Sequence, residues 1–132
     1  MAARGLIVLL SGLAIPLHAQ TQRTLSANDQ RARDIFEQLI NINTTGSSGS
    51  TTAASKALAD WLLKAGFPPA DVQVIGLAGS PNHNLVARYR GTAGSRLKPI
   101  LLLAHIDVVE ARREDWSLDP FTLTEKDGFF YG

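Results

Sequence analysis

The sequence contains no cysteine. This absence excludes disulfide bonds and thiolate metal sites, although an oxidising compartment outside the cytoplasm would allow disulfides to form. Any metal ion must therefore be held by histidine, aspartate and glutamate side chains. The sequence also lacks a Gly-x-Ser-x-Gly nucleophile elbow and a glycine-rich phosphate-binding loop. Both a serine hydrolase and a nucleotide-binding enzyme are therefore disfavoured.

The sequence also has no excess of positive or negative residues. The chain has 13 basic and 12 acidic residues, and 45% of its residues are hydrophobic, which is the composition of a globular protein. Nucleic-acid binding would require a basic stripe on the surface. We therefore expect no nucleic-acid partner.

No apolar run in the sequence is long enough for a stable membrane span. The N-terminal run over residues 6–17 is shorter than the roughly 20 apolar residues that a span requires, and it contains helix-breaking residues. Arg4 precedes this run and small residues follow it near Ala19, as in a secretory signal peptide. We predict a signal peptide over residues 1–19, with an uncleaved anchor as the alternative. Residues 20–132 are then periplasmic or secreted.

Two amphipathic helices are predicted in the first half of the mature chain. The first runs from about Ala27 to Ile42 behind Ser26 as its N-cap, and the second runs from about Thr51 to Ala65, with Gly66 as its stop. One face of each helix carries apolar residues at helical spacing: Ala32, Ile35, Phe36 and Leu39 in the first, and Ala54, Ala57, Leu58, Trp61, Leu62 and Ala65 in the second. We interpret the polar segment Asn43–Ser50 between the helices as a simple linker.

Three strands are predicted after the helices, over Asp71–Leu77, Asn84–Arg90 and Pro99–Ala104. The first two show partial alternation of apolar and polar residues, whereas the third is an unbroken apolar run. Such a run suits a strand that helices cover on both faces, with a short buried helix as the alternative. The predicted fold class is α/β, with helices packed on a mixed, largely parallel sheet.

A hairpin is predicted at the end of the sequence. Phe121–Glu125 and Phe129–Tyr131 flank Asp127-Gly128, a residue pair that tolerates positive φ. The second arm ends with the sequence itself at Gly132, three residues after it begins. We therefore expect the chain to be the truncated first part of a larger domain.

His105 and Asp107 directly follow the third predicted strand. Ligands of open α/β sheets bind beyond the carboxyl ends of strands, and His-x-Asp in an extended segment places both side chains on the same face. A neutral imidazole can bind a metal through one nitrogen while the other nitrogen donates to a carboxylate. Alone, the pair is weak evidence, because a histidine after a strand more often has a structural role.

Three other residues could belong to a site, but each has a simpler interpretation. His83 could be a second metal ligand, yet a histidine in a turn is usually a surface residue. Trp116 and Phe121 could line a substrate pocket, yet aromatic residues beside a hairpin more often pack against it. We interpret His83 as a surface residue and the two aromatic residues as packing residues.

The segment from Pro99 to Gly132 carries a longer ordered pattern. An apolar strand is followed by His-x-Asp-Val-Val, then Trp, Asp-Pro-Phe and Asp-Gly-x-x-Tyr-Gly. This pattern resembles the zinc exopeptidase family that includes aminoacylases, glutamate carboxypeptidases, acetylornithine deacetylases and succinyl-diaminopimelate desuccinylases. Two positions depart from it: Ala104 stands where the family commonly has glycine, and Glu110 where it has proline. Neither departure removes an atom that binds metal.

The resemblance implies a hydrolase that cleaves a peptide or amide bond with a zinc-activated water. It implies two zinc ions, which cobalt or manganese could replace, with His105 binding one ion and Asp107 orienting its imidazole. The remaining ligands and the general base are expected beyond Gly132, so the isolated chain should be inactive. The expected substrate is a small peptide or an N-acyl amino acid. The family's second domain, which would form a homodimer, is also expected beyond this chain.

A non-catalytic alternative stays open at the level of sequence. The chain could be an exported binding module that keeps the fold without the metal. The residues beyond Gly132 would distinguish the two functions, because an aspartate soon afterwards and paired glutamates further on favour the enzyme.

Overall fold

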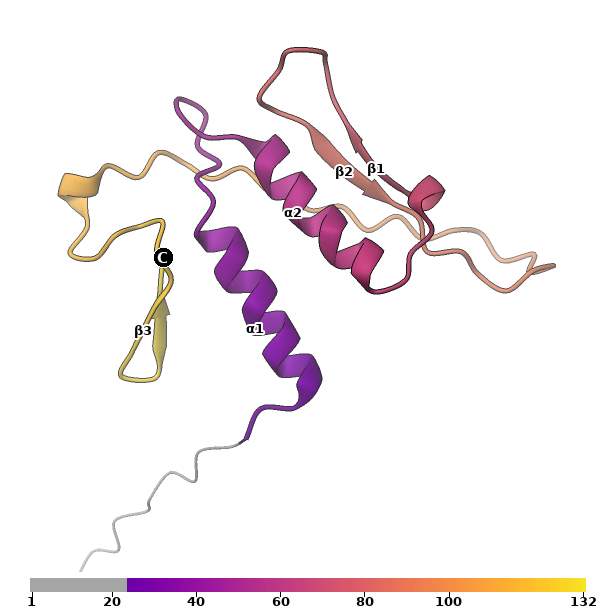
Figure 1. Cartoon of the computed structure of the whole chain (residues 1–132), viewed down its shortest axis with the longest axis horizontal. Coiled ribbons are helices and arrows are strands. Elements are labelled where there is room, and N and C mark those ends of the chain that lie inside the picture. Colours follow the sequence, from indigo (N-terminus) through magenta and orange to yellow (C-terminus); the bar gives the residue numbers. More distant parts are fainter. Residues whose placement is uncertain (1–23) are drawn as a thin grey trace, which may run out of the picture.

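Residues 24–132 are described by a computed structural model, in which two helices lie beside two separate β-hairpins (Figure 1). The predicted signal peptide lies outside these residues. The elements, in chain order, are α1 (Ala27–Ile40), α2 (Thr51–Lys64), the 3₁₀ turn η1 (Pro69–Asp71), β1 (Val72–Ile75), β2 (Asn84–Ala87), the 3₁₀ turn η2 (Arg113–Asp115), β3 (Thr124–Lys126) and β4 (Phe129–Tyr131). Within residues 24–132, no helix has the length and hydrophobicity needed to cross a membrane.

Helix α1 begins at a capping box. The Ser26 hydroxyl accepts from the Asp29 amide at 3.2 Å, and the Asp29 carboxylate accepts from the Ser26 amide at 3.1 Å. These bonds satisfy amides that have no partner within the helix, and the Ser26 side chain lowers the pKa of Asp29. The helix ends two residues before the predicted Ile42, because the chain turns at Asn41, whose side chain accepts from the Leu123 amide.

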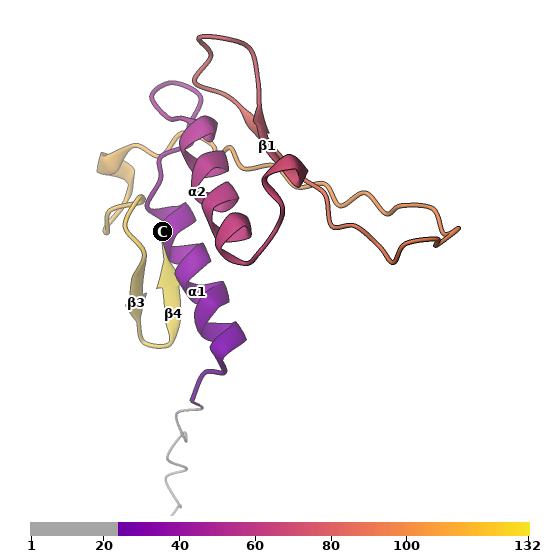
Figure 2. The same ribbon diagram turned by 45° about the vertical axis from the view of Figure 1, so that its right-hand side comes forward.

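The predicted apolar face of α1 is only partly covered. Ile35 and Leu39 are half-buried, while Phe36 is 43% exposed and meets the ring of Phe130 edge-on. This contact joins α1 to the hairpin β3–β4, which lies along the helix (Figure 2).

Helix α2 packs against the hairpin β1–β2 through small side chains. Ser50 caps the helix by accepting from the Ala53 amide, and Gly66 follows the helix with a φ of 94°, as expected for a glycine stop. Ala54 and Ser55 are fully buried, and Ser55 donates to the His83 carbonyl at 2.9 Å. The helix therefore binds the hairpin both by close packing and by a buried hydrogen bond.

The two hairpins are antiparallel. Strand β1 pairs with β2 from Val72 opposite Ala87 to Ile75 opposite Asn84, and β3 pairs with β4. The loop between β3 and β4 has positive φ at both Asp127 (54°) and Gly128 (79°), as the Asp-Gly pair predicts. The first two predicted strands are therefore confirmed with shorter bounds. The terminal hairpin is confirmed too, with β4 as predicted and β3 shifted to Thr124–Lys126.

The third predicted strand, Pro99–Ala104, is not a strand in the structure. The segment is extended and unpaired, and the side chains from Ile100 to Leu103 are 84–89% exposed. An apolar run becomes a buried strand only when neighbouring strands take up its backbone groups, and no described segment does so. The structure is therefore α/β with small antiparallel sheets, and its parallel pairing within residues 24–132 is limited to one bridge between Thr45 and Val108.

A buried carboxylate fixes the start of the first hairpin. Asp71, whose side chain is 2% exposed, accepts two hydrogen bonds from Arg90, at 2.7 and 2.8 Å. Its carbonyl also accepts from the Arg88 amide at 2.8 Å. The side-chain bond from Arg90 is the main cause that holds the pKa of Asp71 below its ordinary value.

Asp71→Asn is expected to lower the stability of the chain in a pH-dependent way. A carboxyl whose pKa is lowered on folding stabilises the folded state above its ordinary pKa, and this stabilisation is lost as the pH falls through the folded value. The urea midpoint of the variant should therefore lie below that of the parent at neutral pH, and the two should converge in acid. Asp60→Asn, at an exposed site on α2, is the control. A difference in urea midpoint between the variant and the parent that stays the same at all pH values would contradict a lowered pKa for Asp71.

Candidate functional site

The long segment after β2 projects away from the hairpin and returns toward the helices (Figure 1). His105 and Asp107 belong to the stretch of chain between β2 and η2. The Nδ1 atom of His105 lies 2.9 Å from the Asp107 carbonyl oxygen and 3.4 Å from its Oδ1 atom. Their side chains are 85% and 68% exposed. With Nδ1 directed at Asp107, the Nε2 atom faces solution and is the nitrogen open to a ligand.

The loop between the two helices holds the segment that follows His105. Thr44 donates through its hydroxyl to the Ile106 carbonyl at 2.9 Å, and its own carbonyl accepts from the Val108 amide at 3.4 Å. Ser47 donates twice to the Glu110 carboxylate, through its amide at 3.0 Å and its hydroxyl at 2.8 Å. The interpretation of Asn43–Ser50 as a simple linker is therefore wrong, because this loop anchors the site.

The loop owes its shape to a close turn. The Gly49 amide donates to the Thr45 carbonyl at 3.0 Å, and Asn43 accepts from the Thr45 amide through its side chain. A Cβ atom on Gly49 would lie 2.3 Å from the Thr45 nitrogen, so only glycine fits. Thr44 and Thr45 are each 3% exposed. These two buried threonines and the close turn after them form the part of the loop against which residues 106–110 lie.

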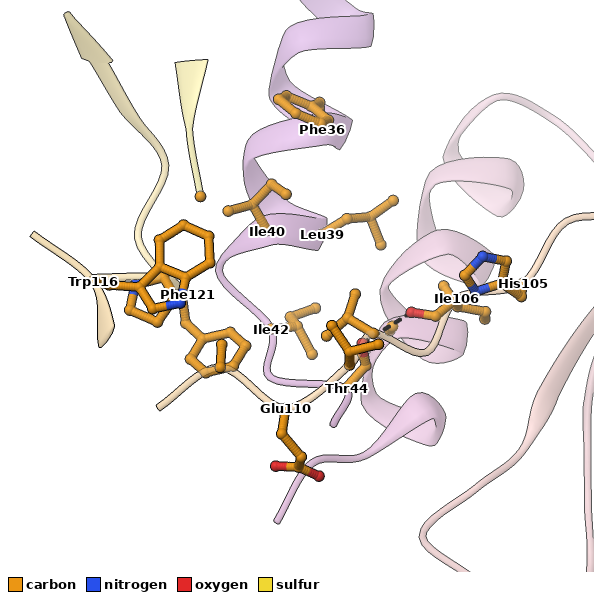
Figure 3. A pocket seen from close by; sticks show the side chains of 16 residues that line it. Phe36, Leu39, Ile40, Ile42, Thr44, His105, Ile106, Glu110, Trp116 and Phe121 are labelled. Atoms are coloured by element: carbon orange, nitrogen blue, oxygen red, sulfur yellow. Dashed lines mark hydrogen bonds between the residues drawn. The ribbon is translucent and has the colours of Figure 1, made fainter. Parts of the chain in front are cut away.

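A cavity of about 410 Å³ lies beside this anchored segment (Figure 3). His105 and Ile106 lie at one end of it and Trp116 and Phe121 at the other, while Glu110 points away from the apolar side chains. The apolar walls come from α1, the loop and the segment after His105, and include Phe36, Leu39, Ile40, Ile42, Val108 and Val109. Trp116 and Phe121, interpreted as packing residues from the sequence, thus also line a cavity.

The donor chemistry of His105 and Asp107 fits one metal ligand and the carboxylate that orients it. Metal-binding imidazoles usually donate their second nitrogen to a carboxylate or a carbonyl, and Asp107 offers both groups to Nδ1. A catalytic zinc ion normally has three protein ligands. Residues 24–132 contain no group of three or more side chains that could hold a metal ion. The described residues therefore provide one position of such a site and not a whole one.

His83 has a structural role in this fold. Its Nε2 atom lies 2.9 Å from the Leu77 carbonyl oxygen, and its amide donates to the Thr52 hydroxyl. Its carbonyl accepts from Ser55, and its ring lies so close to Gly76 that a Cβ there would be 2.1 Å away. His83 thus joins the β1–β2 loop to α2 and is half-buried, where the sequence predicted an ordinary surface histidine.

Comparison with characterised proteins identifies relatives of this chain. An acetylornithine deacetylase of Pasteurella multocida is 45% identical over 76 residues, which are 57% of this chain and 18% of that protein. An acetylornithine deacetylase of Vibrio parahaemolyticus is 35% identical over 104 residues, or 75% of this chain and 25% of that protein. An N-fatty-acyl-amino acid synthase/hydrolase of Mus musculus is 45% identical over 56 residues, covering 38% and 11% of the two chains.

The chain is related to the zinc exopeptidase and amidohydrolase family. The resemblance inferred from the pattern around His105 is thereby confirmed. The matched part spans a quarter or less of the length of these relatives. No family model matches the chain, and no solved structure matches it significantly.

Proposed function

We propose that this chain is the N-terminal part of the catalytic domain of a metal-dependent hydrolase that cleaves amide bonds. The observation that carries the proposal is the His105–Asp107 pair, in which Nδ1 is held and Nε2 faces solution. The relatives support the reaction class, because they include enzymes named as a deacetylase and as an N-acyl-amino acid hydrolase.

The geometry of the pair supports a role for each of the two residues. His105 would hold the metal ion through Nε2. Asp107 keeps the proton of the imidazole on Nδ1 and fixes the direction of the ring, which makes Nε2 the better ligand. Zinc, or cobalt or manganese in its place, would polarise the scissile carbonyl and lower the pKa of a bound water. A second ion, further ligands and a general base would have to come from residues other than 24–132.

The substrate class we propose is an N-acyl amino acid or a small peptide. The relatives are named for acetylornithine and for N-fatty-acyl amino acids, both of which are N-acyl amino acids. The cavity beside His105 has apolar walls, which is compatible with an acyl group.

The larger context of the chain is part of the same proposal. Residues 1–19 would be a signal peptide that directs residues 20–132 to the periplasm or outside the cell. Residues Ile100–Leu103, which are 84–89% exposed here, would form a buried strand of a mixed, largely parallel sheet in the full domain. A second domain would form a homodimer.

Hydrolysis assays on the natural full-length protein test this function. Acetylornithine, a long-chain N-acyl amino acid and a dipeptide should be offered with and without a chelator. We expect release of a free amine from one of the three, loss of this activity with the chelator, and its return on addition of zinc. Amine release that resists chelation would exclude metal-dependent hydrolysis. No hydrolysis together with no bound metal would favour an exported binding module.

A further inference from the structure

The hydrogen bonds between the helix-connecting loop and residues 106–110 are not spread evenly. Two of them involve backbone groups of alternate residues, the Ile106 carbonyl and the Val108 amide. The other two involve only the side chain of Glu110. In an extended chain the backbone groups of alternate residues face the same edge, and those of the residues between them face the opposite edge. The loop therefore occupies one edge of the segment and leaves the Asp107 carbonyl on the other.

The Asp107 carbonyl is the group that meets the His105 ring, with Nδ1 at 2.9 Å. The direction of the imidazole thus depends on which edge of the segment the loop occupies. A rotation of the segment about its own axis would turn the Asp107 carbonyl away from Nδ1 and would release the ring. A contact that prevents the segment from rotating therefore also fixes the direction of the His105 ring.

Two groups could prevent this rotation: the Thr44 hydroxyl, which donates to the Ile106 carbonyl at 2.9 Å, and the side chain of Glu110. The bond from the Val108 amide is long at 3.4 Å, whereas the carboxylate of Glu110 accepts two bonds from Ser47 at 2.8 and 3.0 Å. Bonds to an ionised acceptor are stronger than those between neutral groups, and two bonds to one carboxylate restrict rotation as well as distance. Glu110 also stands where the related family commonly has proline, so the bonds replace a restriction that a proline ring would impose on the backbone.

We propose that Glu110 is a positioning residue, which through Ser47 fixes the segment after His105 and thereby the direction of the His105 imidazole. The proposal rests on the proposed function, since it concerns the same metal ligand. Its prediction about the ring does not require a metal or an activity. Its failure can therefore be told apart from failure of the hydrolase proposal.

Nuclear magnetic resonance on the natural full-length protein, stripped of metal, tests this role. Glu110→Ala should raise the hydrogen-exchange rates of the Ser47 and Val108 amides about fivefold to tenfold, the effect of losing about one hydrogen bond. The ¹⁵N shifts of the His105 ring should move from the Nδ1-protonated form toward those of a free imidazole. Glu110→Gln, which keeps one acceptor oxygen, should give intermediate values and so rescue part of the effect.

Two controls keep the test specific. Glu114→Gln changes an exposed glutamate with no hydrogen-bond partner among the described residues, and should leave all these signals unchanged. The amides of β1 and β2 report whether each variant is folded. Unchanged His105 shifts in a folded Glu110→Ala protein would overturn the proposal, whether or not the exchange rates rise. If the alanine variant does not fold, unchanged shifts and exchange rates in Glu110→Gln would overturn it equally.

A further measurement separates positioning from general stability. In the metal-loaded protein, loss of ring orientation should lower kcat. KM for the substrate should change less than twofold, because the Glu110 carboxylate points away from the apolar side chains of the cavity (Figure 3). A change confined to KM would contradict a role through His105.

Discussion

Replacing His105 with alanine is expected to reduce kcat/KM of the natural full-length protein by more than about a hundredfold. Loss of a residue that only orients a metal ligand typically costs 10- to 100-fold, and loss of the ligand itself should cost more. Asp107→Asn, which keeps the backbone carbonyl but changes the carboxylate, should fall within the smaller range. The measurement is steady-state hydrolysis together with the metal content of each variant.

His83→Ala is the matched control for this prediction. His83 contacts the Leu77 carbonyl and belongs to the joint between the β1–β2 loop and α2, so its loss should lower the unfolding temperature. Activity per folded molecule should stay near that of the parent. If His83→Ala abolished activity while His105→Ala did not, the assignment of the metal ligand would be wrong.

Gly49→Ala is expected to destabilise the protein by about 3 kcal/mol or more, the upper range for forcing a group into a filled site. The added Cβ would meet backbone atoms of Thr44 and Thr45 at 2.3–2.6 Å, and backbone yields less readily than a flexible side chain. The loop would have to open, which would release Ile106 and Val108. Urea unfolding measures the loss, and hydrogen exchange at Val108 shows where it occurs.

Gly91→Ala provides the comparison, because nothing lies within 4 Å of a Cβ at that position and its φ is not positive. Its unfolding midpoint should match that of the parent. Equal midpoints for Gly49→Ala and Gly91→Ala would mean that the loop is not the close turn described here.

The elements set by local chemistry could be predicted from the sequence. Helix α1 begins where Ser26 and Asp29 form a capping box, and the terminal hairpin turns where Asp127 and Gly128 take positive φ. Each of these features depends on residues within a few positions of one another. The end of α1 was predicted two residues late, because the turn at Asn41 is fixed by a bond to Leu123, far away in the sequence.

The strand predicted over Pro99–Ala104 was wrong because its pairing, too, depends on residues far away in the sequence. Its apolar composition indicates burial, but burial of a strand depends on partners that a local pattern does not specify. In the structure the side chains of this segment are exposed and its backbone is unpaired.

The candidate site was predictable only in part. His-x-Asp after an apolar run indicated a pair of side chains on one face, and the structure places Nδ1 of His105 against Asp107. The bonds from Ser47 to Glu110 join residues 63 positions apart. A serine in a polar loop and a glutamate after two valines carry no sign of such pairing. The one feature of the sequence that could have drawn attention to this contact is Glu110 itself, which stands where the related family commonly has proline.

The central claim is that Nε2 of His105 binds a catalytic metal ion. The most direct test is a crystal structure of the natural full-length protein grown with zinc, with diffraction recorded on both sides of the zinc absorption edge. We expect an anomalous peak about 2.0–2.1 Å from Nε2, with Nδ1 still directed at Asp107. Zinc bound elsewhere, with the His105 ring free of metal, would contradict it.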